Sequence, residues 1–228
     1  MRPFAPYDTR HYETADVRSG YEVWSETYDA KMTDRIDRPL LEAMRFDWRG
    51  TVVLDQACGT GRIGAWLRQK GASAIDGLDM TEAMLDKARG KGIYRTLLLA
   101  DVRSTGLPDA SYDAVVQVLA CEHLDAIEPL YAEVKRITKP KGVFVLVGYH
   151  PYMMLRGIPT HFTRSDGRDL AIQQFIHLTS DHVNAGTAAG LRLEQMEENV
   201  VDEAWVADNP KYQRHFGSPI SFALRFSA

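Results

Sequence analysis

A glycine-rich turn constrains the fold of this chain more than any other feature of its sequence. The segment VLDQACGTGRIG (53–64) follows an apolar, β-branched run and places Gly59, Gly61 and Gly64 in the spacing GxGxxG. Glycines at a strand-to-helix turn let the backbone approach a bound ligand closely. The spacing alone is a weak signal, so its context has to decide which ligand it serves.

Around this turn, short apolar runs alternate with helical patterns. The runs span 51–55, 74–79, 95–101, 112–120 and 142–150, and the helical patterns span 62–71, 81–92 and 128–138. Strands that are apolar along their whole length and alternate with helices predict a parallel sheet covered on both faces. The turn KPKG (139–142) leads into the fifth run.

The end of the chain has a different pattern. A helix is expected over 178–191, with Thr179 or Ser180 as its N-cap and Gly190 as its stop. The strand candidates 192–205 and 220–226 follow with no crossover helix between them, which predicts an antiparallel hairpin at one sheet edge. The predicted fold class is therefore α/β, a three-layer αβα sandwich whose seven-stranded, mostly parallel sheet ends in a C-terminal antiparallel hairpin.

The chain shows no repeat, low-complexity tract or long linker, which predicts a single domain over 1–228. We expect 1–48 to form an N-terminal helical lid whose first twenty or so residues are a flexible lead. The cofactor-binding core is expected over 49–150 and a substrate-cap insertion over 151–178. A C-terminal helix and hairpin would fill 179–228. Within the insertion, SDGR (165–168) predicts a hairpin turn.

Composition narrows the classes of partner and compartment. The formal net charge of −4 argues against a nucleic-acid partner, because such proteins usually carry a basic surface. The only cysteines, Cys58 and Cys121, form no paired pattern, which favours a reducing compartment. No apolar run is long enough for a membrane span and the N-terminus does not resemble a signal peptide, so we expect a cytoplasmic protein with no membrane partner. A monomer and a homodimer both stay open.

Three carboxylates stand at the tips of three successive predicted strands. Asp55 precedes the first glycine by four residues, where it would repel a pyrophosphate but suit a ligand with an ammonium group. Asp79 ends the second strand and is placed to accept from ribose hydroxyls. Asp101 ends the third strand and is placed to accept from an adenine amine, with the backbone of Val102 beside it. Like charges clustered at one edge repel unless a ligand satisfies them, so these residues predict a nucleoside ligand with a cationic end.

The chain resembles the class I, S-adenosylmethionine-dependent methyltransferases over about residues 20–150. The resemblance rests on four motifs: VLDQACGTG, GLDMTEAML, LLLADV and the KPKG turn. The opening YEVWSETYD (21–29) also resembles small-molecule methyltransferases, and together with KARGKGIY (87–94) it resembles a methyltransferase-like subgroup. Gln56 departs from the family, which usually has an apolar residue there, and can place a polar group under the cofactor.

The resemblance implies S-adenosylmethionine as cofactor and S-adenosylhomocysteine as product, with three aromatic residues of 21–28 folded over the cofactor as a lid. The predicted cofactor contacts are Tyr21, Trp24, Tyr28, Asp55, Ala57, Cys58, Gly59, Gly61, Asp79, Met80, Asp101, Val102 and Leu119.

Histidines near the fourth and fifth strands are the candidates for a general base, because a neutral imidazole suits proton removal near neutral pH. His123 and His150 are the first candidates. The predicted substrate contacts are Tyr149, Tyr152 and His161, and His161 is also a third candidate base. Glu122 is expected only to contact solvent or to cap a helix. His177, Asp181 and His182 are interpreted as structural, and no metal is predicted.

These features predict methyl transfer from S-adenosylmethionine to a small-molecule acceptor. O-methylation is favoured, and N- or C-methylation stays open. One alternative is an RNA or protein methyltransferase, although no NPPY-like tetrapeptide follows the fourth strand, where VLACEHL stands. A second alternative is a cofactor-binding protein without methyl transfer. A nicotinamide-dependent dehydrogenase is disfavoured by Asp55 and by the terminal hairpin.

Overall fold

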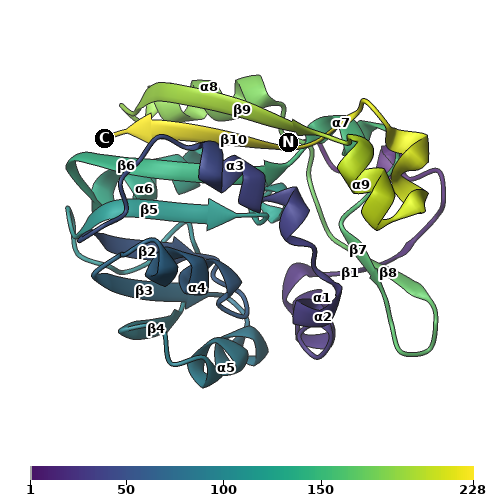
Figure 1. Cartoon of the computed structure of the whole chain (residues 1–228), viewed down its shortest axis with the longest axis horizontal. Helices are drawn as coiled ribbons and strands as arrows, with labels where there is room; N and C mark the ends of the chain where they lie inside the picture. Colours follow the sequence, from purple (N-terminus) through teal and green to yellow (C-terminus); the bar gives the residue numbers. More distant parts are fainter. Residues whose placement is uncertain (1) are drawn as a thin grey trace.

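The computed structural model describes residues 2–228, apart from the side chain of Lys31. Its main sheet has seven strands in the order β4-β3-β2-β5-β6-β10-β9 (Figure 1). Their bounds are Thr96–Leu99 (β4), Ala74–Asp79 (β3), Val52–Gln56 (β2), Tyr112–Val118 (β5), Thr138–Tyr149 (β6), Pro219–Ser227 (β10) and Arg192–Val200 (β9). Strands β2 to β6 pair in parallel, whereas β10 is antiparallel to both β6 and β9. The α/β prediction with a C-terminal antiparallel hairpin is confirmed.

Helices cover both faces of this sheet. On one face, α3 (Arg38–Ala43) and α4 (Arg62–Gln69) pack on a cluster that includes Val53 and Val116. On the other, α6 (Glu128–Ile137) and α8 (Thr179–Ala188) pack on a cluster that includes Leu54 and Phe144. Neighbouring residues of one strand point to opposite faces, so a continuous apolar run feeds both clusters.

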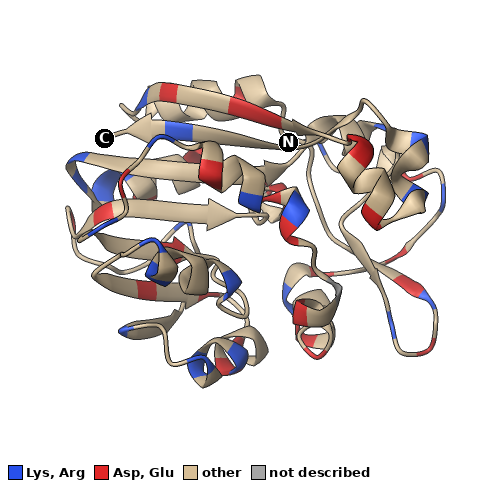
Figure 2. Cartoon of the chain, in the orientation of Figure 1, with Lys and Arg blue, Asp and Glu red and all other residues tan. Residues whose placement is uncertain are grey.

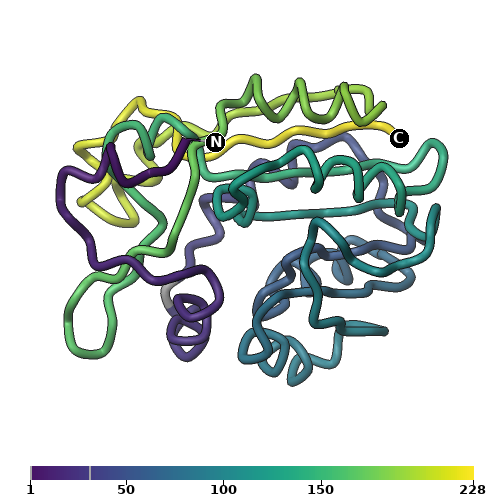
Figure 3. The backbone as a smooth tube through the Cα atoms, turned by 180° about the vertical axis from the view of Figure 1, so that it is seen from behind, coloured from purple at the N-terminus to yellow at the C-terminus, as the bar shows by residue number. Residues whose placement is uncertain are grey.

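The first residues are ordered by a second sheet, so the expectation of a flexible lead is wrong. Strand β1 (Glu13–Ala15) pairs in parallel with β8 (Asp169–Ile172), which pairs antiparallel with β7 (His161–Thr163). The 3₁₀ turn Ala5–Tyr7 precedes β1, and Phe4 is buried with its N–H on the Gln174 carbonyl. Figure 3 shows the N-terminal segment running beside the green hairpin formed by β7 and β8. The predicted turn at 165–168 joins β7 to β8 and is confirmed.

Several boundaries differ from the sequence prediction. The aromatic segment at 21–28 is divided between α1 (Val17–Trp24) and α2 (Tyr28–Lys31), and the 3₁₀ turn Asp34–Ile36 leads from them to α3. The predicted strand 192–205 stops at Val200, because the Asp202 carboxylate accepts from Trp205 N–H and starts α9 (Glu203–Asp208). The predicted KPKG turn lies inside the long β6.

The remaining elements complete the edges of the sandwich. The short helices are α5 (Glu82–Gly90), which packs against β3 and β4, and α7 (Pro151–Leu155), and 3₁₀ turns occupy Cys121–His123 and Pro210–His215. Helix α8 is capped by the Asp181 carboxylate, which accepts from Leu178 N–H, and not by Thr179 or Ser180 as predicted. Across residues 2–228, no helix combines the length and the apolar character that a bilayer crossing requires.

Candidate active site

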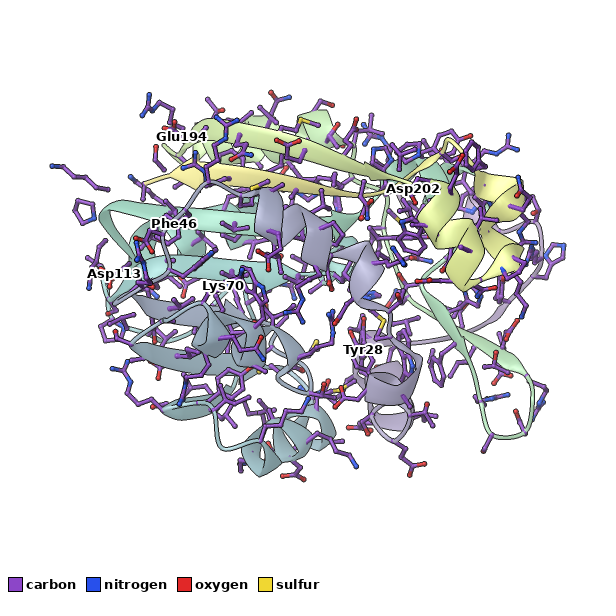
Figure 4. All side chains as sticks on the ribbon, viewed as in Figure 1. Tyr28, Phe46, Lys70, Asp113, Glu194 and Asp202 are labelled. Atoms are coloured by element: carbon purple, nitrogen blue, oxygen red, sulfur yellow. The ribbon has the colours of Figure 1, made fainter. Side chains whose placement is uncertain are left out.

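A cavity of about 520 Å³ opens at the carboxyl ends of β2, β3 and β5. In open parallel sheets this edge is where ligands bind. Ten of the residues predicted from the sequence line this cavity: Tyr21, Tyr28, Ala57, Gly59, Asp79, Met80, Asp101, Val102, Leu119 and His123. Helices α1 and α2 lie beside α5 (Figure 1), and all three contribute lining residues, among them Tyr28 of α2, which Figure 4 labels.

Asp79 connects the glycine turn to the start of α5. One carboxylate oxygen accepts from Gly59 N–H at 2.9 Å and the other from Thr81 N–H at 2.9 Å. Burial raises the pKa of this carboxyl, while the backbone N–H groups act in the opposite direction. Asp79 therefore has two roles that one substitution removes together: it fixes the loop and presents an acceptor to the cavity.

Asp101 is ion-paired instead of free. Its carboxylate accepts from the guanidinium of Arg103 at 2.7 Å, and Arg103 also contacts Asp125 at 2.9 Å. The bonds from Arg103 hold the pKa of Asp101 below its usual value. All three side chains line the cavity, so a ligand amine that approaches Asp101 shares it with Arg103.

Two strand tips hold non-glycine residues in a left-handed backbone conformation. Ala57 ends the β2 tip with φ 59° and Leu119 ends the β5 tip with φ 54°. Such conformations cost about 1 kcal/mol or more for a residue with a Cβ. Both residues line the cavity, which places backbone strain at this candidate site.

The sequence suggested that Gln56 could place a polar group under the cofactor. In the structure, Gln56 does not line the cavity. Its side chain is fully buried and its amide donates to the Val102 carbonyl at 2.9 Å. Gln56, the residue that departs from the family pattern, thus holds the segment after β4 in place. Val102 of that segment lines the cavity.

Two of the three glycines leave room for a tyrosine side chain, and the third leaves room at the cavity. A Cβ on Gly64 would lie 2.5 Å from Tyr94 Cζ, and one on Gly61 would lie 2.9 Å from Tyr94 Cε2. A Cβ on Gly59 would meet nothing within 4 Å, so only this glycine faces open space. No local pattern indicates that Tyr94, which lies thirty residues after Gly64, fills the space that Gly61 and Gly64 leave.

We expect Gly64→Ala to destabilise the protein by about 1–3 kcal/mol, because the new methyl group overpacks against the Tyr94 ring. Alanine is the better helix former by about 1 kcal/mol, so propensity alone predicts the opposite sign. Urea unfolding measures the difference. Gly90→Ala is the matched control, since a Cβ there meets nothing within 4 Å and α5 should gain stability. In a Tyr94→Ala background the Gly64→Ala penalty should vanish, and a penalty that persists there contradicts the proposed clash.

Asp55 lies behind the turn and does not line the cavity. Its carboxylate accepts from the Tyr94 hydroxyl at 2.6 Å, and the residue is 1% exposed. Burial raises the pKa of Asp55 to about 7. The predicted contact with a ligand ammonium group is therefore not direct in this structure, because Tyr94 occupies one carboxylate oxygen.

This raised pKa predicts a pH dependence of stability. An unfolded aspartate titrates near pH 3.9, so between about pH 4 and pH 7 the folded protein holds a proton that the unfolded chain has released. The contribution of Asp55 to the free energy of unfolding is therefore fully present below pH 4 and is lost as the pH rises through 7. We expect the free energy of unfolding of the wild type to fall by about 2–3 kcal/mol more than that of Asp55→Asn between pH 5 and pH 8. Denaturant unfolding at both pH values tests this, with Asp86→Asn on exposed α5 as control, and equal pH slopes in wild type and Asp55→Asn would refute it.

Ion pairs and a hydrogen bond connect segment 29–37 to the glycine turn and to the neighbouring ends of α4 and α5. Asp29 of α2 accepts from Lys91 at 2.8 Å and also from the Thr60 hydroxyl. Arg62 at the start of α4 donates to Asp34 at 2.6 Å and to the buried Asp37. The turn is therefore linked directly to the residue that follows Tyr28, whose side chain lines the cavity.

Tyr21 and His123 form a hydrogen-bonded pair at the cavity wall. The Nδ1 of His123 lies 2.7 Å from the Gln173 carbonyl, which can only accept, so Nδ1 carries the proton. In the neutral ring Nε2 is then an acceptor, and the Tyr21 hydroxyl donates to it at 2.9 Å. The Tyr21 oxygen keeps a lone pair for a further hydrogen bond.

A second cavity of about 410 Å³ adjoins the first. The two share three lining residues, Tyr21, Tyr28 and Leu119. Tyr149 and His161, predicted as substrate contacts, line the second cavity, as does Trp24, which was predicted to contact the cofactor. The insertion between β6 and α8 supplies part of its wall through Pro159–Thr163.

Other predicted site residues lie elsewhere. His150 accepts from Tyr152 N–H and contacts Glu198 of β9 at 3.0 Å, and it lines neither cavity, because the chain turns into α7 directly after β6. Tyr152 is 39% exposed and lines neither cavity. Cys58 is buried inside the glycine turn, and Gly61 is the N-cap of α4.

The interpretation of His177, Asp181 and His182 as structural agrees with their contacts. His177 Nε2 donates to the Leu124 carbonyl at 2.7 Å, Asp181 caps α8, and His182 contacts the Tyr131 hydroxyl at 3.1 Å. Burial lowers the pKa of His182 to about 3. Within residues 2–228, no group of three or more His, Cys, Asp or Glu side chains is arranged to hold a metal ion.

Comparison with known proteins identifies a family match for the segment that supplies most of the first cavity's lining. Residues 54–146 match a family model described as a methyltransferase domain. The chain is 33% identical over 130 residues to malonyl-[acyl-carrier protein] O-methyltransferase of Serratia marcescens, which covers 57% of this chain and 51% of that protein. It thus spans about half the length of that relative.

Two further likenesses extend over more of the chain. It is 28% identical over 185 residues to methyltransferase-like protein 27 of Homo sapiens, covering 75% of this chain and 67% of that protein. A solved S-adenosylmethionine-dependent methyltransferase from Mesorhizobium loti superposes with a TM-score of 0.71 at 24% identity, covering 83% of this chain and 96% of that one. At that identity the superposition shows a shared fold.

Proposed function

We propose that this chain, which carries a methyltransferase domain in the class I, S-adenosylmethionine-dependent fold, transfers a methyl group from S-adenosylmethionine to a small molecule. The observation that carries the proposal is the pair of adjoining cavities. The first cavity is lined by the glycine turn, Asp79 and Asp101. The second cavity shares three lining residues with the first: Tyr21, Tyr28 and Leu119. Two ligands held in this way have one shared boundary at which a group can pass.

The residues of the first cavity fit this cofactor. Its volume of about 520 Å³ is within the usual range for ligand sites, and the open space over Gly59 leaves room for a ligand against the backbone. We assign Asp79 to the ribose hydroxyls, the Asp101–Val102 segment to the adenine, and Ala57 and Gly59 to the amino-acid part. When bound, the cofactor supplies a methyl group activated by a positively charged sulfur.

The chain itself supplies positioning and proton removal. The relative named an O-methyltransferase supports an oxygen acceptor. A hydroxyl in the second cavity can give its proton to the Tyr21 oxygen while Tyr21 gives its own proton to His123 Nε2. The Gln173 carbonyl then stabilises the charged imidazole through the bond from Nδ1. His123 is thus the proposed base and Tyr21 its relay.

The volume of the second cavity and the mixed charges on the protein surface support a small acceptor. The second cavity holds about 410 Å³, which suits a small molecule better than a macromolecule. Figure 2 shows acidic and basic residues side by side on α5, where Arg89 pairs with Glu82 at 2.7 Å. A phosphate backbone needs a surface of one sign, so an RNA acceptor is less well supported.

Calorimetric titration with S-adenosylmethionine, S-adenosylhomocysteine and NAD tests the cofactor, and a screen for transfer of labelled methyl groups tests the reaction. We expect micromolar binding of both sulfur compounds and none of NAD. Failure to bind either sulfur compound, or a preference for NAD, would refute the proposal. Tight binding with no transfer to any acceptor would favour a cofactor-binding protein without methyl transfer.

A further inference from the structure

Glu122 is a buried carboxylate with no basic partner in the part of the chain whose side chains are described. It follows β5 in the 3₁₀ turn Cys121–His123 and is 3% exposed, so the expectation that it contacts solvent or caps a helix is wrong. Its contacts are weak: Thr160 Oγ1 donates to it at 3.4 Å and Cys121 Sγ lies at 3.8 Å. A buried carboxylate costs free energy unless a cation or several donors satisfy it.

The carboxylate lines the second cavity, whose walls leave it unneutralised. Among the described side chains that line this cavity, His161 alone can carry a positive charge. Its Nδ1 already donates to the Pro159 carbonyl at 2.8 Å. A cationic ligand would therefore complete the charge balance of this cavity.

Aromatic rings form much of the remaining wall. The Trp24 ring stacks on Phe162 with centroids 4.9 Å apart, and Tyr28 packs against the same indole at 4.9 Å. Tyr149 and Tyr212 also line the cavity. Burial, and to a lesser extent the charge of Glu122, raises the pKa of Tyr149, so this phenol stays neutral. Neutral aromatic faces attract organic cations.

A second polar group in the wall also lacks a partner. The Trp24 indole N–H is buried and donates to nothing that the structure describes. It needs an acceptor, such as a hydroxyl or carbonyl oxygen. This N–H is closed off from the cavity space, so the polar group that the cavity offers to a ligand is the Glu122 carboxylate, which has no basic partner.

We propose that the second cavity takes a small organic amine, whose ammonium group pairs with Glu122 and whose apolar part packs on the aromatic wall. This rests on the proposed function, because the amine would be the methyl acceptor held beside the cofactor cavity. The pairing concerns recognition: the ammonium group fixes the acceptor's orientation toward Tyr21 and Leu119, the residues shared by both cavities.

The test uses matched pairs of probes on the full chain loaded with S-adenosylhomocysteine. Tyramine is compared with its neutral counterpart 4-ethylphenol, and benzylamine with benzyl alcohol, by calorimetry. We expect the wild type to bind the amine of at least one pair tenfold or more tightly than the neutral partner. Glu122→Gln, which keeps the side-chain shape, should remove that preference and leave the affinity for S-adenosylhomocysteine within twofold. Glu128→Gln, on the exposed start of α6, is the control and should keep the preference.

The outcomes separate the two proposals. If S-adenosylhomocysteine does not bind, the proposed function fails. If it binds but no amine is preferred, no probe binds, or the preference survives Glu122→Gln, only the amine inference is overturned. The comparison of probes in the wild type decides the inference even if Glu122→Gln does not fold.

Discussion

Asp79→Ala is expected to weaken S-adenosylhomocysteine binding at least 100-fold. The substitution removes the acceptor proposed for the ribose, and it leaves the N–H groups of Gly59 and Thr81 without the carboxylate that holds them at 2.9 Å. Hydrogen bonds to charged groups contribute about 1.5–3 kcal/mol each, and a 100-fold loss corresponds to about 2.7 kcal/mol. Calorimetric titration measures the loss directly.

Controls separate this loss from a general loss of structure. Asp86→Ala removes a carboxylate from the exposed face of α5 and should bind like the wild type. Thermal unfolding of Asp79→Ala shows whether the sheet remains folded. An affinity within threefold of the wild type in a folded Asp79→Ala protein would contradict the assignment of Asp79 and, with it, the placement of the cofactor in the first cavity.

Tyr21→Phe is expected to lower kcat for a hydroxyl acceptor about 100-fold and to change the affinity for S-adenosylhomocysteine less than threefold. The variant keeps the ring, which packs against Trp24 at 5.7 Å, and removes only the hydroxyl that bridges to His123. General-base catalysis contributes about 10²–10⁴-fold. Steady-state kinetics with an acceptor from the transfer screen provides the measurement.

A control variant makes this prediction specific. Tyr152→Phe changes an exposed tyrosine outside both cavities and should leave kcat unchanged. An unchanged kcat in Tyr21→Phe would show that the acceptor loses its proton by another route.

Much of the fold was predictable because its signals are local. Each strand from β2 to β6 is a short apolar run, and its period and length are visible within a few residues. The acidic residues Asp79 and Asp101 were predictable as cavity residues for the same reason. They end successive parallel strands, and the carboxyl ends of such strands meet at one edge.

The errors have a common physical cause, since each involves a partner distant in sequence. Strand β1 forms because it pairs with β8, about 155 residues later, and its own sequence carries no strand signal. Glu122 was expected at the surface because its type is usually exposed, whereas Thr160 and the insertion cover it. His150 was expected in the pocket, but the turn into α7 directs it to Glu198.

The sequence by itself determined the αβα class, the strand-tip acids and the resemblance to methyltransferases, because periodicity and motif spacing are properties of a continuous segment. Only the tertiary structure decided that Tyr94 fills the space over Gly61 and Gly64, that Tyr21 hydrogen-bonds to His123, and that Glu122 is buried beside aromatic rings without a basic partner. Those facts depend on which side chains of distant segments meet, and burial then sets whether a charge or a donor is satisfied. The class of reaction is therefore indicated by short motifs, while the class of acceptor depends on a cavity assembled from five separate parts of the chain.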